Sequence, residues 1–229
     1  MAIKILIVAA TDLELKPLLN NRDCEILTED HLKRITFENK KIDILITSIG
    51  MVPTSFYLTL ILSRHNYDCV INMGICGAFD ASFLLGDVVN VEKDTFAELA
   101  YENDEELALL KLGDSLGEEM LTLNINNLNP IKSAVIDNLR KVNGVTVSTI
   151  TGSQKKIDYF SKMYAPDVES MEGAAFLYVC NALNQPCAQI RSISNFIGNP
   201  DKKDWNIELA VNNLAEVVLR IIDELRKSN

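Results

Sequence analysis

The sequence has few of the features that mark membrane, metal or nucleic-acid proteins. Its first apolar run, Ile3–Ala10, is interrupted by Lys4 and ends at Thr11, which is too short for a secretion signal or a membrane span. Only two histidines are present, without a ligand cluster around them, and lysine and arginine (22) are outnumbered by aspartate and glutamate (32). We therefore expect a cytoplasmic protein with no metal site, no membrane contact and no nucleic-acid partner, because its net charge of −10 would repel phosphate backbones.

The cysteines are few, and their spacing does not suggest pairs. The five cysteines form an odd set without any C-x-x-C spacing: Cys24, Cys69, Cys76, Cys180 and Cys187. Scattered through apolar stretches, they indicate reduced and mostly buried thiols in a reducing compartment rather than a disulfide framework.

The chain alternates strand-like and helix-like segments. Apolar, β-branched runs predict strands at Lys4–Ala10, Ile42–Ile49, Cys69–Met73, Asp87–Val91, Val145–Ile150 and Cys187–Ile193. Helical spacing and capping residues predict helices at Thr11–Leu19, Thr54–Arg64, Gly173–Leu183 and Ile207–Lys227. We interpret this alternation as one three-layer α/β domain over residues 1–229, with an acidic, Asn-rich stretch at Glu98–Asn129 that we expect to be irregular.

Ligands of open α/β sheets lie beyond the carboxyl ends of the strands. The candidate binding residues are therefore those that follow each predicted strand: Thr11 to Glu14, Gly50 and Met51, Gly74 to Gly77, Thr151 to Ser153, and Ser194 and Asn195.

Three local motifs each allow a structural and a functional interpretation. Gly74–Ala78 lacks both the G-x-G-x-x-G spacing and the Walker lysine, so that it is either an ordinary strand-to-turn junction or a loop that lets the backbone approach a flat ligand. Glu172, which opens an apolar helix, either complements the helix dipole or accepts hydrogen bonds from a ribose diol. Arg191, within an apolar strand, either reaches solvent from a sheet edge or meets a carboxylate or a ligand.

Together these motifs resemble the nucleoside phosphorylase and nucleosidase superfamily. The matching segments are Asn72–Gly77 followed by Gly86–Val89, then Ser170–Ala175 and Arg191–Asn195, in the expected order. The resemblance runs from Ile5 to the C-terminal helix. It implies a three-layer α/β/α sandwich with a central mixed β-sheet, no cofactor, and a homo-oligomer, most simply a homodimer. The apolar Val52–Pro53 and Phe56–Tyr57 region is either the interface or internal packing.

Within this superfamily, the sequence resembles the hydrolases more than the phosphorylases. Phosphorylases carry a glycine- and arginine-bearing phosphate loop after the first strand, where this chain has the acidic segment Ala9–Glu14. Glu14 matches the glutamate that activates water in nucleosidases. Asn195 stands where methylthioadenosine/S-adenosylhomocysteine nucleosidases have aspartate, and its amide can donate to a 6-oxopurine. The segments Ser194–Gly198 and Asp201–Trp205 resemble the futalosine hydrolase branch, which releases hypoxanthine.

The resemblance also implies roles for the remaining candidates. Glu172 would bind the ribose hydroxyls, with Met171 on the sugar face and Arg191 orienting a carboxylate or water. The purine would be bordered by Cys76, Gly77, Lys156 and Trp205, where Met171 and Trp205 are otherwise simple packing residues. Ile75 stands where family nucleosidases often carry serine.

Two other functions fit the same residues. One is a methylthioadenosine/S-adenosylhomocysteine nucleosidase or an aminodeoxyfutalosine nucleosidase, in which Asn195 replaces the usual aspartate. The other is a non-catalytic nucleoside-binding protein on the same fold. The presence of both Glu14 and Glu172 favours catalysis over binding alone.

Overall fold

The computed structural model describes residues 3–20, 24–26, 32–37, 40–98, 100–102, 107–109, 124–198 and 202–227. Its centre is a ten-stranded sheet in the order β11-β10-β6-β12-β5-β1-β4-β3-β2, with β9 paired to β6 outside this path. The strands of this sheet are β1 (Ile5–Ala9), β2 (Cys24–Ile26), β3 (Leu32–Phe37), β4 (Lys40–Ile46), β5 (Cys69–Ala78), β6 (Val88–Phe96), β9 (Asn124–Asn126), β10 (Arg140–Thr146), β11 (Val168–Ser170) and β12 (Cys187–Phe196).

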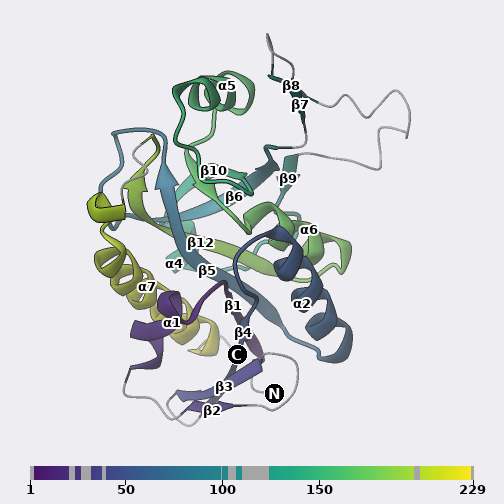
Figure 1. Ribbon diagram of the computed structural model, residues 1–229. Helices are drawn as coiled ribbons and strands as arrows, with labels where there is room; N and C mark the ends of the chain where they lie inside the picture. The colour runs from purple at the N-terminus through teal and green to yellow at the C-terminus, as the bar shows by residue number, and fades with distance from the viewer. Residues whose placement is uncertain are drawn as a thin grey trace.

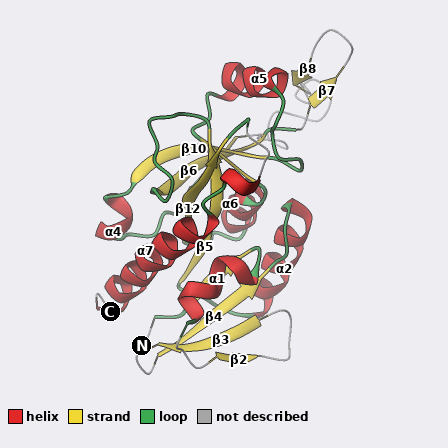
Figure 2. Ribbon diagram, turned by 60° about the vertical axis from the view of Figure 1, so that its left-hand side comes forward, coloured by secondary structure: helices red, strands yellow, loops and turns green. Residues whose placement is uncertain are grey.

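The sheet is mixed. The central strand β5 is parallel to β1 and β12, whereas β12 is antiparallel to β6. The helices are α1 (Asp12–Leu19), α2 (Met51–Arg64), α4 (Ala134–Asp137), α5 (Gln154–Tyr164), α6 (Gly173–Ala182) and α7 (Ile207–Lys227), with a short 3-10 turn at Lys202–Asp204. Figures 1 and 2 show α1 and α7 on one face of the sheet and α2 and α6 on the other, which is the predicted three-layer α/β/α arrangement.

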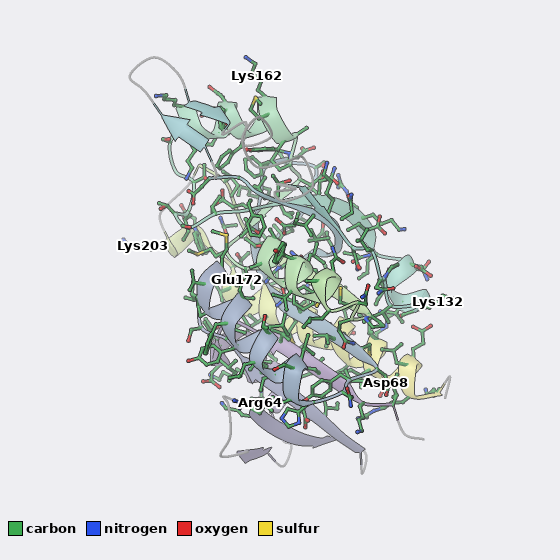
Figure 3. The ribbon with its side chains drawn as sticks, turned by 90° about the vertical axis from the view of Figure 1, so that its right-hand side faces the viewer. Arg64, Asp68, Lys132, Lys162, Glu172 and Lys203 are labelled. Atoms are coloured by element: carbon green, nitrogen blue, oxygen red, sulfur yellow. The ribbon has the colours of Figure 1, made fainter. Side chains whose placement is uncertain are left out.

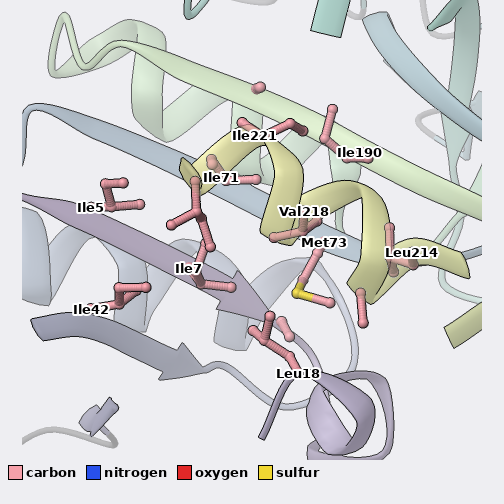
Figure 4. Packing of buried hydrophobic residues seen from close by; sticks show 14 of the residues in the cluster. Ile5, Ile7, Leu18, Ile42, Ile71, Met73, Ile190, Leu214, Val218 and Ile221 are labelled. Carbon is pink, nitrogen blue, oxygen red and sulfur yellow. The ribbon is translucent and has the colours of Figure 1, made fainter. Parts of the chain in front are cut away.

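The two faces are built by alternation along the strands. Ile5 and Ile7 of β1 pack with α1 and α7, whereas Leu6 and Val8 pack with α2 and α6. Successive side chains of a strand point to opposite faces, so that a continuous apolar run fits a strand covered on both sides. Figure 4 shows the first face, where residues of β1, β5 and β12 meet α7 and Leu18 of α1.

Several predicted boundaries were wrong. The strand expected at Val145–Ile150 is β10, which begins at Arg140 and ends at Thr146. The first half of β10 includes exposed positions, which are occupied by polar residues. An apolar run therefore does not mark this half as a strand. The strands expected to end at Met73 and Ile193 continue to Ala78 and Phe196, so Gly74–Gly77 and Ser194–Asn195 are strand residues rather than loops.

Other elements were not predicted at all, among them α5 and the short strands β2, β3 and β11. In the range Glu98–Asn129, expected to be irregular, the structure has β9 and a small two-stranded sheet of β7 (Ala100–Glu102) and β8 (Leu107–Leu109). Residues 99, 103–106 and 110–123 of that range lie outside the described residues. Among the described helices, none is both long and apolar enough to cross a membrane.

Candidate active site

A cavity of about 250 Å³ opens where β1, β5, β11 and β12 approach the first turns of α1 and α6. Its wall contains residues from three of the five segments that follow predicted strands, residues of the Ser170–Ala175 motif, and several residues that were not predicted, whereas Gly50, Met51 and Thr151 to Ser153 do not line it. The lining residues are Ala10, Thr11, Leu13, Glu14, Ile49, Ile75, Cys76, Gly77, Ile150, Glu169, Ser170, Met171, Glu172, Ser194, Asn195, Ile197 and Trp205. The three candidates Glu14, Glu172 and Asn195 therefore share one cavity.

Glu14 lies in the first turn of α1 and is almost fully buried, with 6% of its surface exposed. Its Oε2 accepts the N–H groups of Ala10 and Thr11 at 3.1 and 3.0 Å, and its Oε1 accepts the N–H of Ile75 at 3.2 Å. Burial raises the pKa of this carboxyl, and the nearby negative charge of Glu172 adds to that effect, while Arg191 and the N–H donors oppose it. The carboxyl group of Glu14 is therefore fixed in position, and its affinity for a proton is higher than that of an exposed glutamate.

Glu172 directly precedes α6, and its carboxylate faces the start of α2. Its Oε1 accepts the N–H of Gly50 at 3.0 Å, and Gly50 has a φ of +104°, a conformation that favours glycine. Figure 3 shows Glu172 where α6 begins, beside the first turn of α2, whose far end is marked by Arg64. The loop after β4 thus holds the carboxylate at the cavity wall.

Arg191 of β12 lies behind these two carboxylates and is 1% exposed. Its Nη2 donates to Asn72 Oδ1 at 2.6 Å and stands 3.9 Å from Glu172 Oε2. Gly74 of β5 makes room for it, because a Cβ at that position would lie 1.9 Å from Arg191 Nη1 and 2.8 Å from Glu14 Oε1. Arg191 is not among the lining residues, so it supports the carboxylates from below the cavity surface.

A second cluster of buried polar side chains supports the start of α6. Asp94 of β6 accepts hydrogen bonds from Thr146 Oγ1 at 2.8 Å and Gln189 Nε2 at 2.9 Å, and Thr146 Oγ1 in turn accepts the N–H of Ala174 at 2.8 Å. Burial raises the pKa of Asp94 to about 6. A Cβ on Gly173 would lie 2.1 Å from Asp94 Oδ2, so only glycine fits directly after Glu172.

Asn195 of β12 also lines the cavity and is 5% exposed. Its Oδ1 accepts the hydroxyl of Ser194 at 2.8 Å, and its Nδ2 lies next to Gly77, where a Cβ would come within 3.0 Å of it. Asn195 pairs with Gly77 across β12 and β5. The amide therefore stands two residues along β5 from Ile75, whose N–H holds Glu14.

The remaining predicted residues divide into two groups. Cys76, Gly77, Met171 and Trp205 line the cavity, and burial raises the pKa of the Cys76 thiol to about 12, which makes it an unreactive group. Lys156 does not line the cavity, contrary to the prediction. It lies in the first turn of α5, an element that was not predicted, and its Nζ pairs with Glu98.

Sequence reasoning missed Glu169 of β11, which lines the cavity and is 5% exposed. Its position directly before the Ser170–Ala175 motif was the available signal. For a metal, the described residues contain no group of three or more histidine, cysteine, aspartate or glutamate side chains placed to hold one.

The comparisons with known proteins identify the family of the chain. The model of the family described as "Phosphorylase superfamily" matches residues 4–223. The chain belongs to this superfamily. Among curated relatives, it is 28% identical over 181 residues to a futalosine hydrolase of Thermus thermophilus, covering 78% of this chain and 80% of that one. It is 25% identical over 200 residues to a 5'-methylthioadenosine/S-adenosylhomocysteine nucleosidase of Colwellia psychrerythraea, covering 79% and 78%.

Solved structures give the same fold. A Helicobacter pylori methylthioadenosine nucleosidase mutant with 5'-methylthioadenosine in its active site superposes with a TM-score of 0.79 at 17% identity, covering 98% of this chain and all of that one. The futalosine hydrolase of the same organism also has a TM-score of 0.79 at 17% identity, covering 98% and 99%. These two structures share the fold of this chain.

We expect Glu172→Gln to lower the pKa of Glu14, because it removes the neighbouring negative charge and leaves Arg191 to act on Glu14 alone. Titration of the glutamate side-chain carboxyls by ¹³C NMR measures this shift. Glu92→Gln, which removes an exposed carboxylate paired with Lys141, should leave the titration unchanged. A Glu14 pKa that stays constant or rises in Glu172→Gln would contradict the coupling of the two carboxylates.

Proposed function

We propose that this protein is a nucleosidase that hydrolyses the N-glycosidic bond of a 6-oxopurine nucleoside, with futalosine as the first candidate substrate. The observation that carries the proposal is one cavity lined both by the buried carboxylates of Glu14 and Glu172 and by the amide of Asn195. The similarity to a futalosine hydrolase and to methylthioadenosine/S-adenosylhomocysteine nucleosidases supports cleavage of a purine nucleoside.

The charge of the cavity favours water over phosphate as the attacking group. The charged side chains among its lining residues are Glu14, Glu169 and Glu172, and no lysine, arginine or histidine of the described residues lines it. A phosphate ion needs positive groups or several free N–H donors, whereas carboxylates repel it. Hydrolysis therefore suits this site better than phosphorolysis does.

In the proposed mechanism, the C–N bond breaks ahead of water attack and the ribose acquires oxocarbenium character, as in glycoside cleavage. Glu172 binds the ribose hydroxyls and stabilises the positive charge. Glu14 accepts a proton from the attacking water, which then bonds to the anomeric carbon. Ile75 has no side-chain hydroxyl. Its main-chain N–H donates to Oε1 of Glu14 and positions this residue, and Oε1 keeps lone-pair capacity for the water.

The departing base is stabilised by Asn195. One N–H of the amide Nδ2 donates to the carbonyl oxygen of Phe196 at 3.3 Å, and the other can donate to the carbonyl oxygen or the imidazole nitrogen of hypoxanthine. The released base takes its proton from solvent because an amide cannot protonate it. Stabilising donors of this kind are typically worth about two to three orders of magnitude in rate. Cys76, Gly77, Met171 and Trp205 border the bound nucleoside in this proposal.

A methylthioadenosine/S-adenosylhomocysteine or aminodeoxyfutalosine nucleosidase is the second candidate, favoured by the similarity to the enzyme of Colwellia psychrerythraea. Both candidates require the carboxylate pair, and they differ at the base. A non-catalytic nucleoside-binding protein would need neither a second carboxylate nor a buried arginine to support it.

We expect the protein to release hypoxanthine from futalosine, and more slowly from inosine, and to act poorly on methylthioadenosine, because the amide of Asn195 is matched to a 6-oxopurine. Chromatography of the free bases after incubation measures all three. Preferential release of adenine would favour the second candidate, and intact nucleosides would favour a binding protein.

The variant Asn195→Asp serves as the matched comparison in this assay. Its carboxyl group can accept from an adenine amino group, so cleavage of adenine nucleosides should increase relative to the parent protein. An unchanged ratio of hypoxanthine to adenine release would remove Asn195 from base selection.

We expect Glu14→Gln to reduce kcat by about 10²- to 10⁴-fold, the usual contribution of a general base, while nucleoside affinity stays nearly constant. Single-turnover kinetics and calorimetric titration with an uncleaved nucleoside measure the two quantities. The control is Glu92→Gln, which changes an exposed carboxylate that does not line the cavity. Loss of affinity with unchanged kcat would contradict the proposed role.

We also propose a homodimer formed through the outer face of α2. Val52 and Phe56 are 81% and 60% exposed, whereas Tyr57 packs against the core, so the predicted apolar region divides into an outer and an inner part. Exposed apolar patches of this kind commonly mark interfaces. We expect Phe56→Asp to convert a dimer into a monomer in sedimentation analysis, and a monomeric parent protein would refute this assembly.

A further inference from the structure

Helix α6 begins beside the cavity without a hydrogen bond from the side chain that precedes it. Glu172 occupies the N-cap position, and its main-chain carbonyl accepts the N–H of Phe176 at 2.9 Å. An N-cap side chain usually accepts a main-chain N–H two or three residues further on. Among the described residues, the carboxylate of Glu172 makes no such bond to the first turn of α6 and instead accepts the N–H of Gly50 at 3.0 Å. This carboxylate therefore lines the cavity rather than the start of its own helix.

The side chain of Thr146 takes the place of the missing cap. The N–H of Ala174, the second residue of α6, is one of the four at a helix start that have no acceptor within the helix. It donates to Thr146 Oγ1 of β10 at 2.8 Å. This is the donor that a capping side chain at position 172 would accept. Thr146 thus occupies the group that competes with the cavity for the carboxylate of Glu172.

Asp94 fixes the direction of the Thr146 hydroxyl. Asp94 Oδ1 accepts this hydroxyl and also the N–H of Thr95, each at 2.8 Å. Asp94 Oδ2 accepts Gln189 Nε2 at 2.9 Å. Because the single proton of the hydroxyl is directed to Asp94, the lone pairs of Thr146 Oγ1 face the first turn of α6.

These polar side chains are buried at a cost in stability. Asp94, Thr146 and Gln189 are 1%, 0% and 0% exposed, and Gln189 Oε1 has no hydrogen-bond partner among the described residues. Buried polar groups cost free energy that apolar side chains of the same volume would not, and a carboxyl group costs the most. Packing alone does not account for this cluster, whereas the hydrogen bond that Thr146 accepts from α6 does.

We propose that Thr146, oriented by Asp94, is a positioning residue that keeps the carboxylate of Glu172 available to the nucleoside. This inference rests on the proposed function, in which Glu172 binds the ribose hydroxyls. Without the hydroxyl, the N–H of Ala174 and the positive end of the helix dipole attract the carboxylate, which then turns away from Gly50 and the cavity. Neither Thr146 nor Asp94 is among the lining residues, so both act through Glu172.

The decisive variant is Thr146→Val, which removes the hydroxyl and keeps the volume of the side chain. We expect the N–H of Gly50 to exchange with solvent at least about 5-fold faster, relative to the amides of β5, because its acceptor has moved. Hydrogen exchange followed by NMR measures these rates. Thr146→Ser keeps the hydroxyl and is the matched control, in which the relative rate should match that of the parent protein. An unchanged relative rate in Thr146→Val, or equal acceleration in both variants, would overturn the inference.

Turnover tests whether the position of Glu172 matters to the reaction. For the release of hypoxanthine from futalosine, we expect Thr146→Val to lower kcat by about 10- to 100-fold with a smaller change in KM, and Thr146→Ser to retain most of the kcat of the parent protein. A residue that only supports the fold would lower stability without this split.

Failure of the proposed function is distinguishable in these experiments. A parent protein that releases no base contradicts the proposed function, while exchange at Gly50 still tests the role of Thr146. Faster exchange at Gly50 with an unchanged kcat would confirm that Thr146 positions Glu172 and would contradict the role of Glu172 in the reaction.

A measurement with Thr146 intact covers the case in which Thr146→Val does not fold. Glu172→Gln removes the charge of the carboxylate, so the amide that donates to it should show the larger change in ¹H chemical shift. We expect this amide to be that of Gly50 rather than that of Ala174, although Ala174 is close to the substitution in sequence. A larger change at Ala174 would mean that Glu172 caps its own helix, which would refute the role of Thr146.

Discussion

The site depends on the buried guanidinium of Arg191. Two carboxylates, Glu14 and Glu172, face the same cavity from different helices, and their mutual repulsion grows as water is excluded. Arg191 lies behind them, 3.9 Å from Glu172, and lowers the pKa of Glu14 against the effect of burial. A buried arginine requires partners of its own. Asn72, Glu14 and Glu172 are these partners, so the stabilisation between Arg191 and the two carboxylates is mutual.

This arrangement is possible because the strands carry the residues to one edge of the sheet. β1, β5 and β12 are parallel neighbours, so the segments at their carboxyl ends converge there. Gly74 permits the guanidinium to cross β5, and Gly173 permits α6 to start directly over Asp94 and Gln189. The glycines of the motifs are thus required by close packing at the site rather than by a loop that wraps a phosphate.

The layers could be predicted from the sequence because they depend on local pattern, whereas the roles of Glu14, Glu172 and Asn195 were implied by the resemblance to the superfamily. Apolar runs such as Ile5–Ala9 identify strands covered on both faces, and the amphipathic period of Ile207–Lys227 identifies α7. Pairing across the sheet is not a local property. Glu169 was missed because its place beside Gly77 follows from the antiparallel pairing of β11 with β5, and Lys156 was misplaced because α5 turns it toward Glu98.

The charge balance of the site bears on how catalysis is achieved. Three acidic side chains line the cavity, and the guanidinium of Arg191 beneath them offsets only part of that charge. A neutral nucleoside gains little from such a field in its ground state, whereas a ribose with oxocarbenium character gains much more. Groups that interact more strongly with the transition state than with the substrate raise kcat rather than only lowering KM. The same negative field repels phosphate, so in the proposed enzyme one electrostatic feature both selects water as the nucleophile and stabilises the charge that forms as the bond breaks.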